Sequence, residues 1–87
     1  MKEKYDIVVV EWEDAQSSLE NYELIDLLAI EPVMTCSCGY LINKNKDRIT
    51  LSTMIFGGRI FKHHQTIPTK MIKSFKKLGE TEVEVID

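Results

Sequence analysis

Gly57 and Gly58 join two stretches in which apolar and polar residues alternate, residues 49–56 and 59–67. A two-residue glycine loop between such stretches is typical of a β-hairpin, because turns of the primed type need positive φ and match the twist of the strands. The sequence therefore predicts a tight hairpin in the second half of the chain. This hairpin limits the fold to architectures that contain neighbouring antiparallel strands.

Two further β-strands are predicted before the hairpin, over residues 5–12 and 33–43. The first contains a run of β-branched residues, which favour extended structure. Alternation gives it two apolar faces, Val8, Val10 and Trp12 on one and Ile7 and Val9 on the other. In a small barrel only one face points inward, so we expect the second face to be covered by another element or another subunit.

The remaining segments are less regular. Residues 19–30 predict a short helix or an ordered loop, with Ser17 or Ser18 as the N-cap and Pro32 as the end. Residues 68–71 predict a single 3₁₀ turn. After this turn we expect a short fifth strand over residues 72–78, followed by an acidic tail or a sixth, edge strand over residues 79–87.

Together these segments predict one mainly β domain over residues 1–87, an SH3-like or Sm-like barrel of about five strands. A domain of this size has a small core and little surplus stability, so we expect a homo-oligomer. No apolar run approaches the length of a membrane span, and the first residues do not resemble a signal peptide. An intracellular protein with no membrane association is the resulting expectation.

The charges are segregated along the chain, although the net charge is only −3. Residues 1–35 contain nine acids and two lysines, whereas residues 36–79 contain nine basic residues and a single acid, Asp47. Four more acids follow in residues 80–87. A basic middle between acidic ends can bind an anion, or it can pair with acidic parts of its own fold or of a neighbouring subunit.

The hairpin carries four candidate ligands for an anion, Arg59, Lys62, His63 and His64. A guanidinium group binds phosphate in a bidentate way and an ammonium group acts as a point charge, while the histidines are candidates to bind phosphate or ribose. Neighbouring residues of a strand point to opposite faces. A ligand that contacts most of these groups must therefore lie at an edge or between subunits. The alternative is an exposed polar strand without a ligand.

Four further candidate ligand-binding residues lie outside the hairpin. Trp12 and Tyr40 are candidates to stack on a flat ring such as a base, and Asp14 is a candidate to accept a hydrogen bond from an amine or a ribose hydroxyl. Tyr22 lies in the long first loop, and loops on a rigid scaffold often carry binding groups. For Trp12, packing in a small core is the competing interpretation.

Cys36-x-Cys38 and His63-His64 supply four potential zinc ligands, but strand geometry argues against a shared site. Adjacent histidines point apart, and zinc sites favour a wider cysteine spacing. We therefore expect no metal and no cofactor, and interpret both cysteines as small buried hydrophobic residues in a reducing compartment. The sequence contains no nucleophile elbow, P-loop or metalloprotease helix, so we do not expect an enzyme.

Four motifs follow one another within residues 7–78, and the last is the most specific: Val10-x-Trp12-x-Asp14, Cys38-Gly39-Tyr40-Leu41-Ile42, Asp47-x-Ile49-x-Leu51-Ser52 and Thr66-Ile67-Pro68-x-Lys70-Met71-Ile72. In these motifs the chain resembles an uncharacterised family of small bacteriophage proteins. The resemblance implies a small SH3-like or Sm-like barrel, a phage origin and, with it, the cytoplasm of the infected bacterial host. It carries over no catalytic or binding residue, because the family pattern assigns none.

The basic hairpin, the two-faced first strand and the resemblance lead to one leading functional hypothesis. We expect a non-enzymatic, oligomeric phage protein that sequesters a small anionic, nucleotide-derived immune signal and so counters bacterial defence. Two alternatives stay open. One is an Sm-like RNA-binding protein, against which the acidic ends and the 8% aromatic content argue. The other is a protein-interaction inhibitor that blocks a host enzyme through its acidic first loop.

Overall fold

The computed structural model describes residues 1–15 and 21–86. The described elements are β1 (Lys2–Asp14), α1 (Leu24–Leu28), β2 (Val33–Lys44), β3 (Arg48–Phe56), β4 (Ile60–Pro68), the 3₁₀ turn η1 (Thr69–Met71) and β5 (Ile72–Glu84). The fold is mainly β, as the alternating segments predict. The hairpin of β3 and β4 around Gly57 and Gly58 is confirmed, and both glycines have positive φ.

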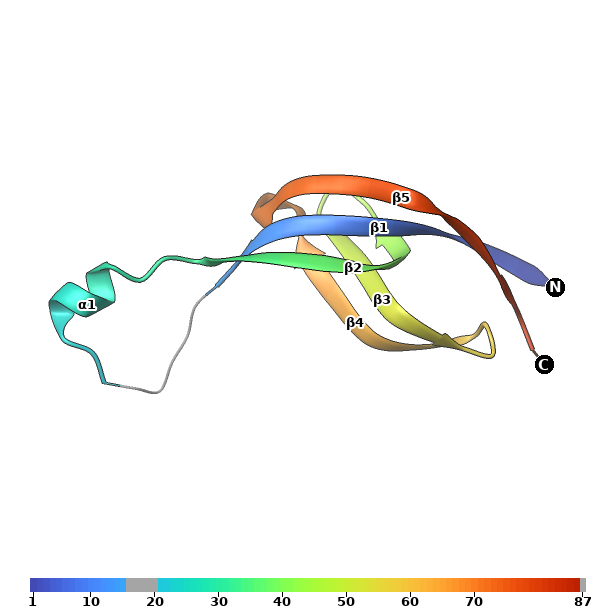
Figure 1. Cartoon of the computed structure of the whole chain (residues 1–87), viewed down its shortest axis with the longest axis horizontal. Coiled ribbons are helices and arrows are strands. Elements are labelled where there is room, and N and C mark those ends of the chain that lie inside the picture. Colours follow the sequence, from blue (N-terminus) through green and yellow to red (C-terminus); the bar gives the residue numbers. More distant parts are fainter. Residues whose placement is uncertain (16–20, 87) are drawn as a thin grey trace.

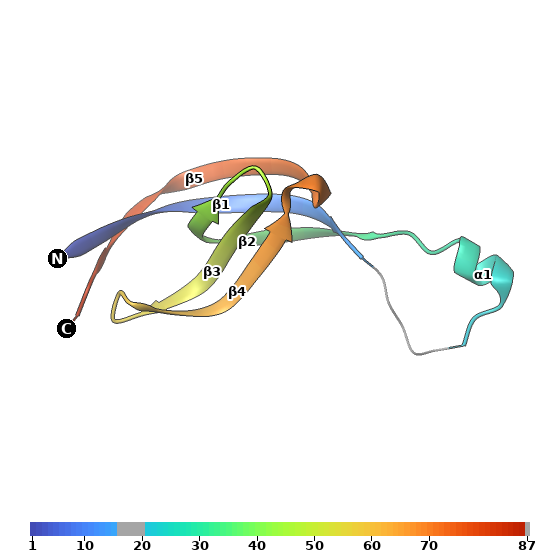
Figure 2. The ribbon, with the colours of Figure 1, turned by 180° about the vertical axis from the view of Figure 1, so that it is seen from behind.

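The five strands form one antiparallel sheet in the order β4-β3-β2-β1-β5. The sheet is strongly bent, so the β3–β4 hairpin lies beneath β1, β2 and β5 (Figures 1 and 2). The two edge strands, β4 and β5, are not joined into a ladder in the described residues, so the expected closed barrel is not formed. A hydrogen bond from the amide of Ile86 to the carbonyl of Gly57, 2.9 Å long, links the two ends of the sheet.

The core lies inside this bend and is small. Its fully buried apolar side chains are Val8, Val10, Ile49, Leu51 and Ile67. Partly buried side chains pack around them, namely Trp12, Leu41, Ile72 and Phe75. Of the two apolar faces of β1, the one with Val8 and Val10 points into the core, whereas Ile7 and Val9 on the other face are half-buried.

The last strand is longer than the sequence predicts. β5 does not end at Leu78 but continues to Glu84, and its second half pairs with the beginning of β1 from Gly79 opposite Ile7 to Glu84 opposite Lys2. A shift in register at Leu78 interrupts the alternation. Glu80, Glu82 and Glu84 therefore belong to an edge strand and not to a separate tail, and Asp87 lies outside the described residues.

Residues 21–32, which precede β2, project away from the sheet (Figure 1). We call residues 21–34 the arm; every one of them is exposed, and α1 within it has no buried residue. The predicted helix is thus short, and the expected cap residues Ser17 and Ser18 lie outside the described residues. The radius of gyration is 16.7 Å, against about 12 Å for a compact domain of this length. Neither α1 nor any other described helix is long and apolar enough to cross a membrane.

Candidate functional site

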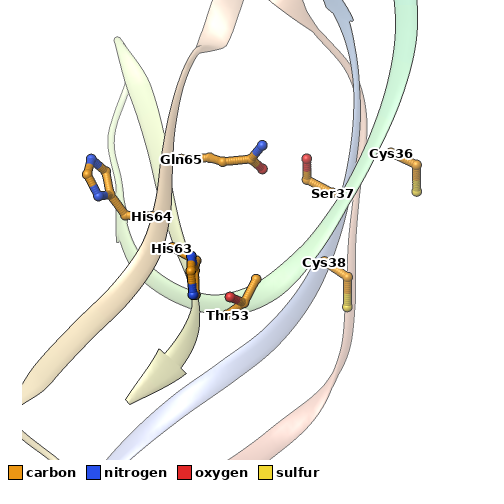
Figure 3. Close-up of a pocket in the computed structure, with 7 residues that line it drawn as sticks. All are labelled: Cys36, Ser37, Cys38, Thr53, His63, His64 and Gln65. Atoms are coloured by element: carbon orange, nitrogen blue, oxygen red, sulfur yellow. The ribbon is translucent and has the colours of Figure 1, made fainter. Parts of the chain in front are cut away.

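A shallow pocket of about 480 Å³ opens where β2 and β3 separate, and Figure 3 shows the residues around it. β2 pairs with β3 from Tyr40 opposite Ser52 towards the end of the strand. The earlier residues of β2 pair only with β1, which leaves a gap that β4 faces from the other side. The lining residues come from these three strands: Cys36, Ser37, Cys38, Thr53, His63, His64 and Gln65.

Ser37 and Gln65 point towards each other across the pocket (Figure 3). Cys36 and Cys38 point away from the pocket on the far side of β2, and both are exposed free thiols. The expectation that the cysteines are buried is therefore wrong. Ser37 is the inward residue of this stretch because it lies opposite the buried Val10, and alternation then places its two neighbours outside.

Trp12 contacts the pocket residue Ser37 from the neighbouring strand β1. Its indole Nε1 donates a hydrogen bond to Ser37 Oγ at 3.0 Å, and its ring packs against the core. Ser37 is itself only 8% exposed. This bond satisfies two polar groups in a partly buried place and fixes the serine side chain. Trp12 thus acts as a packing residue that positions Ser37.

His63 has a backbone conformation that is unusual for a residue with a side chain. Its φ is +55°, in the left-handed region, which costs about 1–2 kcal/mol for an L-residue other than glycine. The carbonyl of the preceding residue, Lys62, accepts a hydrogen bond from the hydroxyl of the fully buried Ser52 at 2.7 Å. This bond holds the backbone in place on one side of His63. Strained residues of this kind occur preferentially at functional sites.

Both histidines line the pocket, although the His64 ring points away from Ser37 and Gln65 (Figure 3), and the other predicted site residues lie outside the pocket. Arg59 and Lys62 lie on the exposed outer part of the hairpin, where Lys62 Nζ lies 4.8 Å from the centre of the Phe56 ring. Tyr40 is half-buried against Tyr5, with ring centres 6.3 Å apart.

Asp14 and Tyr22 lie elsewhere, Asp14 at the end of β1 and Tyr22 on the arm, and both are exposed.

Sequence reasoning missed Ser37, Thr53 and Gln65. Ser37 and Gln65 could have been found from the sequence, because each is a polar residue on a strand face that otherwise points to the core. Ser37 shares a face with Leu41, and Gln65 shares a face with the buried Ile67. A polar side chain at such a position indicates either a buried hydrogen bond or a pocket.

In the described part of the chain, some basic residues of the middle segment, residues 36–79, form ion pairs and others do not. Lys73 and Lys77 of β5 form ion pairs with Glu13 and Asp6 of β1, at 3.7 and 3.4 Å. A hydrogen bond with Glu80 raises the pKa of Lys77 and lowers the pKa of Glu80. Within residues 1–15 and 21–86 no ion pair is found for the other basic residues of the middle segment: Lys44, Lys46, Arg48, Arg59, Lys62, Lys70 and Lys76.

The pocket combines hydroxyl, amide and imidazole groups, which can both donate and accept hydrogen bonds. In the described part of the chain, no three histidine, cysteine, aspartate or glutamate side chains lie close enough together to hold a metal ion. No protein-family model, curated protein or solved structure matches this chain. The chemistry of the site therefore has to be inferred from its own residues.

Proposed function

We propose that this chain is a non-enzymatic binding protein for a small anionic, nucleotide-like ligand held at the pocket between β2 and β4. The observation that carries the proposal is the strained His63 beside His64 in a pocket lined with polar side chains. Strain of this kind needs compensation, and the contacts of a bound ligand are one source of it.

The pocket and the hairpin offer complementary contacts to such a ligand. Ser37, Thr53 and Gln65 can exchange hydrogen bonds with ribose hydroxyls or with the edge of a base. Lys62 precedes the histidines on the same strand, and it has no carboxylate partner in the described residues. It is therefore available to a phosphate that extends from the pocket.

Binding without turnover is part of the proposal. Ser37 Oγ accepts a hydrogen bond from Trp12. Within the described ranges, no hydrogen bond joins a serine or cysteine of the pocket to His63 or His64. A nucleophile and its base are ordinarily within hydrogen-bond reach of each other. The arrangement thus favours a ligand that is held and released intact.

The strand order and the 3₁₀ turn before β5 support assignment of the bent sheet to the SH3-like or Sm-like class. With the resemblance to small bacteriophage proteins, this assignment supports a biological role. In that role a homo-oligomer in the cytoplasm of the infected host sequesters a nucleotide-derived immune signal. Function does not follow from fold alone, so the ligand has to be tested directly.

The test is recovery of the ligand from the protein. The purified chain is incubated with cyclic nucleotides and ADP-ribose derivatives, separated from free ligand, and denatured by heat. We expect one of these compounds to be released intact in an amount comparable to the protein. Release of a degraded compound, or of none, would contradict the proposal.

Variants locate the binding in the same assay. We expect Gln65→Ala and His63→Ala to lose at least tenfold of the recovered ligand, because each removes a polar group that lines the pocket. Lys46→Ala is the control, since this exposed residue lies in the loop between β2 and β3 and does not line the pocket. Equal losses in all three variants would mean that the pocket does not determine how much ligand is retained.

RNA is a second candidate, favoured by one observation on the hairpin. Phe56 and Phe61 are 43% and 39% exposed, and Lys62 lies over the Phe56 ring. Exposed aromatic rings with basic side chains are the usual contacts of single-stranded RNA. A mobility shift with a single-stranded RNA that weakens as salt is raised would support this candidate, and no shift at low salt would exclude it.

A further inference from the structure

The arm presents an apolar surface with only acidic charges. Its large apolar side chains include Leu24, Ile25 and Leu28, which are 70%, 75% and 77% exposed. Its charged residues are Glu23, Asp26 and Glu31. Within the described part of the chain these carboxylates form no ion pair. A surface of this kind in water is typical of a segment that becomes covered in an assembly.

The far end of the β3–β4 hairpin has the opposite charge and a similar apolar character. We call Met54, Phe56, Arg59, Ile60 and Lys62 the hairpin end. Its apolar members are 41%, 43% and 60% exposed, in chain order. Its two basic residues have no ion-pair partner in the described ranges. The two surfaces are therefore complementary both in charge and in apolar character.

These two surfaces cannot meet within one molecule. The arm and the turn between β3 and β4 project from opposite ends of the long axis (Figures 1 and 2). The molecule measures 57 × 24 × 20 Å, so the long axis is more than twice either of the others. Contact between the surfaces must therefore join different copies of the chain.

We propose that the arm of one copy docks on the hairpin end of a second copy of this chain. Leucine and isoleucine side chains of α1 would cover Ile60 and Met54, while Asp26 and Glu23 would pair with Arg59 and Lys62. The need for such cover is large, because the core has five buried apolar side chains whereas fifteen large apolar side chains are exposed among the described residues. This contact uses two different surfaces, so it joins the copies in a reciprocal dimer, in a closed ring or, where the rotation does not close, in an open filament.

The proposal goes beyond ligand binding and is tested on the ligand-free full chain. Leu28→Lys places a positive charge on the arm opposite a basic surface, and Ile60→Asp places a negative charge on the hairpin end opposite an acidic one. Both side chains are at least 60% exposed, so neither change removes a core contact. Leu78→Lys is the control, because this residue on β5 is 54% exposed and belongs to neither surface.

The masses are measured by sedimentation velocity, and folding is checked by circular dichroism. We expect the wild type and Leu78→Lys to be oligomers of the same mass, and Leu28→Lys and Ile60→Asp to be monomers. A mixture of the two monomeric variants should form a one-to-one complex, because one keeps an intact hairpin end and the other an intact arm.

Three results would overturn the proposal. A monomeric wild type would mean that a different molecule covers the surfaces. Variants that keep the wild-type mass would mean that the copies associate elsewhere. A mixture that stays monomeric would mean that the arm of one copy does not bind the hairpin end of another. None of these results depends on whether the pocket binds a nucleotide.

Discussion

The sheet and the arm use similar apolar residues with opposite results. In the sheet, Val8, Leu51 and Ile67 are at most 2% exposed, because the bend brings β3 and β4 under β1 and β2. In the arm, Ile25 and Leu28 are at least 75% exposed, because no part of the described chain lies against α1. The same kind of side chain thus stabilises the fold in one region and remains available for contact in the other.

This difference separates the parts of the chain that hold the fold from the parts to which we assign the proposed contacts. The sheet supplies a small, closely packed core. The pocket contains the strained backbone of His63, and the exposed hairpin end and arm carry charges of opposite sign that form no ion pair in the described residues. Binding groups on exposed segments that a rigid sheet holds in place are a common arrangement.

The largest effect is expected on the free energy of unfolding when a leucine is replaced by alanine in the sheet and, for comparison, in the arm. Leu51→Ala removes a buried side chain, and we expect the free energy of unfolding to fall by about 3 kcal/mol. Leu28→Ala removes an exposed one and should change it by less than about 0.5 kcal/mol. Urea denaturation followed by the fluorescence of Trp12, at a concentration where the protein is dissociated, measures both. Similar losses would mean that the arm folds against the sheet.

The second test concerns the place where the hairpin is attached to the end of β5. A β-carbon at Gly58 would clash with the carbonyl oxygen of Glu84 and lie 2.8 Å from the Cα of Val85, whereas at Gly57 the nearest atom is the Cβ of Ile86 at 4.0 Å. Both glycines have positive φ, so either alanine costs about 1 kcal/mol from backbone strain. We expect Gly58→Ala to cost roughly 2 kcal/mol more because the backbone must move. Equal unfolding free energies for the two variants would show that the attachment contributes nothing.

The third test measures how much stability the strained backbone of His63 costs the fold. His63→Gly relieves the positive φ, so we expect the unfolding free energy to rise by about 1 kcal/mol. The matched variant His64→Gly has no such strain to relieve and should lower it by about 0.5–1 kcal/mol. Thermal denaturation of both variants gives the comparison. A lower unfolding free energy for His63→Gly would mean that contacts of the His63 imidazole stabilise the fold by more than the strained backbone destabilises it.

The smallest expected effect lies on the charged rim of β5. The hydrogen bond from Lys77 lowers the pKa of the Glu80 carboxyl below its ordinary value. Its contribution to stability is therefore present above that ordinary value and disappears as the pH falls through the lowered pKa. Conversely, the raised pKa of Lys77 makes its contribution disappear only at high pH.

We accordingly expect Glu80→Gln to have a slightly lower melting temperature than the wild type at neutral pH and to match it in strong acid. Glu3→Gln is the control, because no ion pair is found for this exposed residue in the described part of the chain. A Glu80→Gln difference that stays constant over the whole acidic range would rule out the ion pair as its cause.

Much of the fold follows from local pattern. The β-branched run of β1 and the glycine turn at Gly57 and Gly58 predict the first strand and the hairpin, and both are confirmed. Alternation gives β1 two apolar faces and does not say which one points to the core. The open sheet and the projecting arm do not follow from local pattern. They depend on how far the sheet bends and on which segments lie against each other, and alternation carries no information on either.

The pocket was predictable only in part. A donor-rich strand marks His63 and His64, but the space beside them exists because the residues of β2 before Tyr40 do not pair with β3, a property of the whole sheet. The error on Cys36 and Cys38 came from residue type, since cysteine is usually buried. Here alternation along β2 decides which side chains are exposed. Ser37 lies opposite the buried Val10 and points inward, so Cys36 and Cys38 point outward.

The central claim is that the pocket between β2 and β4 binds a nucleotide-like anion, and a titration followed by amide NMR shifts tests it most directly. ADP-ribose and cyclic nucleotides are added in turn to the labelled protein. We predict that the binding compound shifts the amides of Ser37, Thr53, His63 and Gln65 first and most. Shifts confined to the basic loop of Lys44, Lys46 and Arg48, or no shifts with any compound, would contradict the claim.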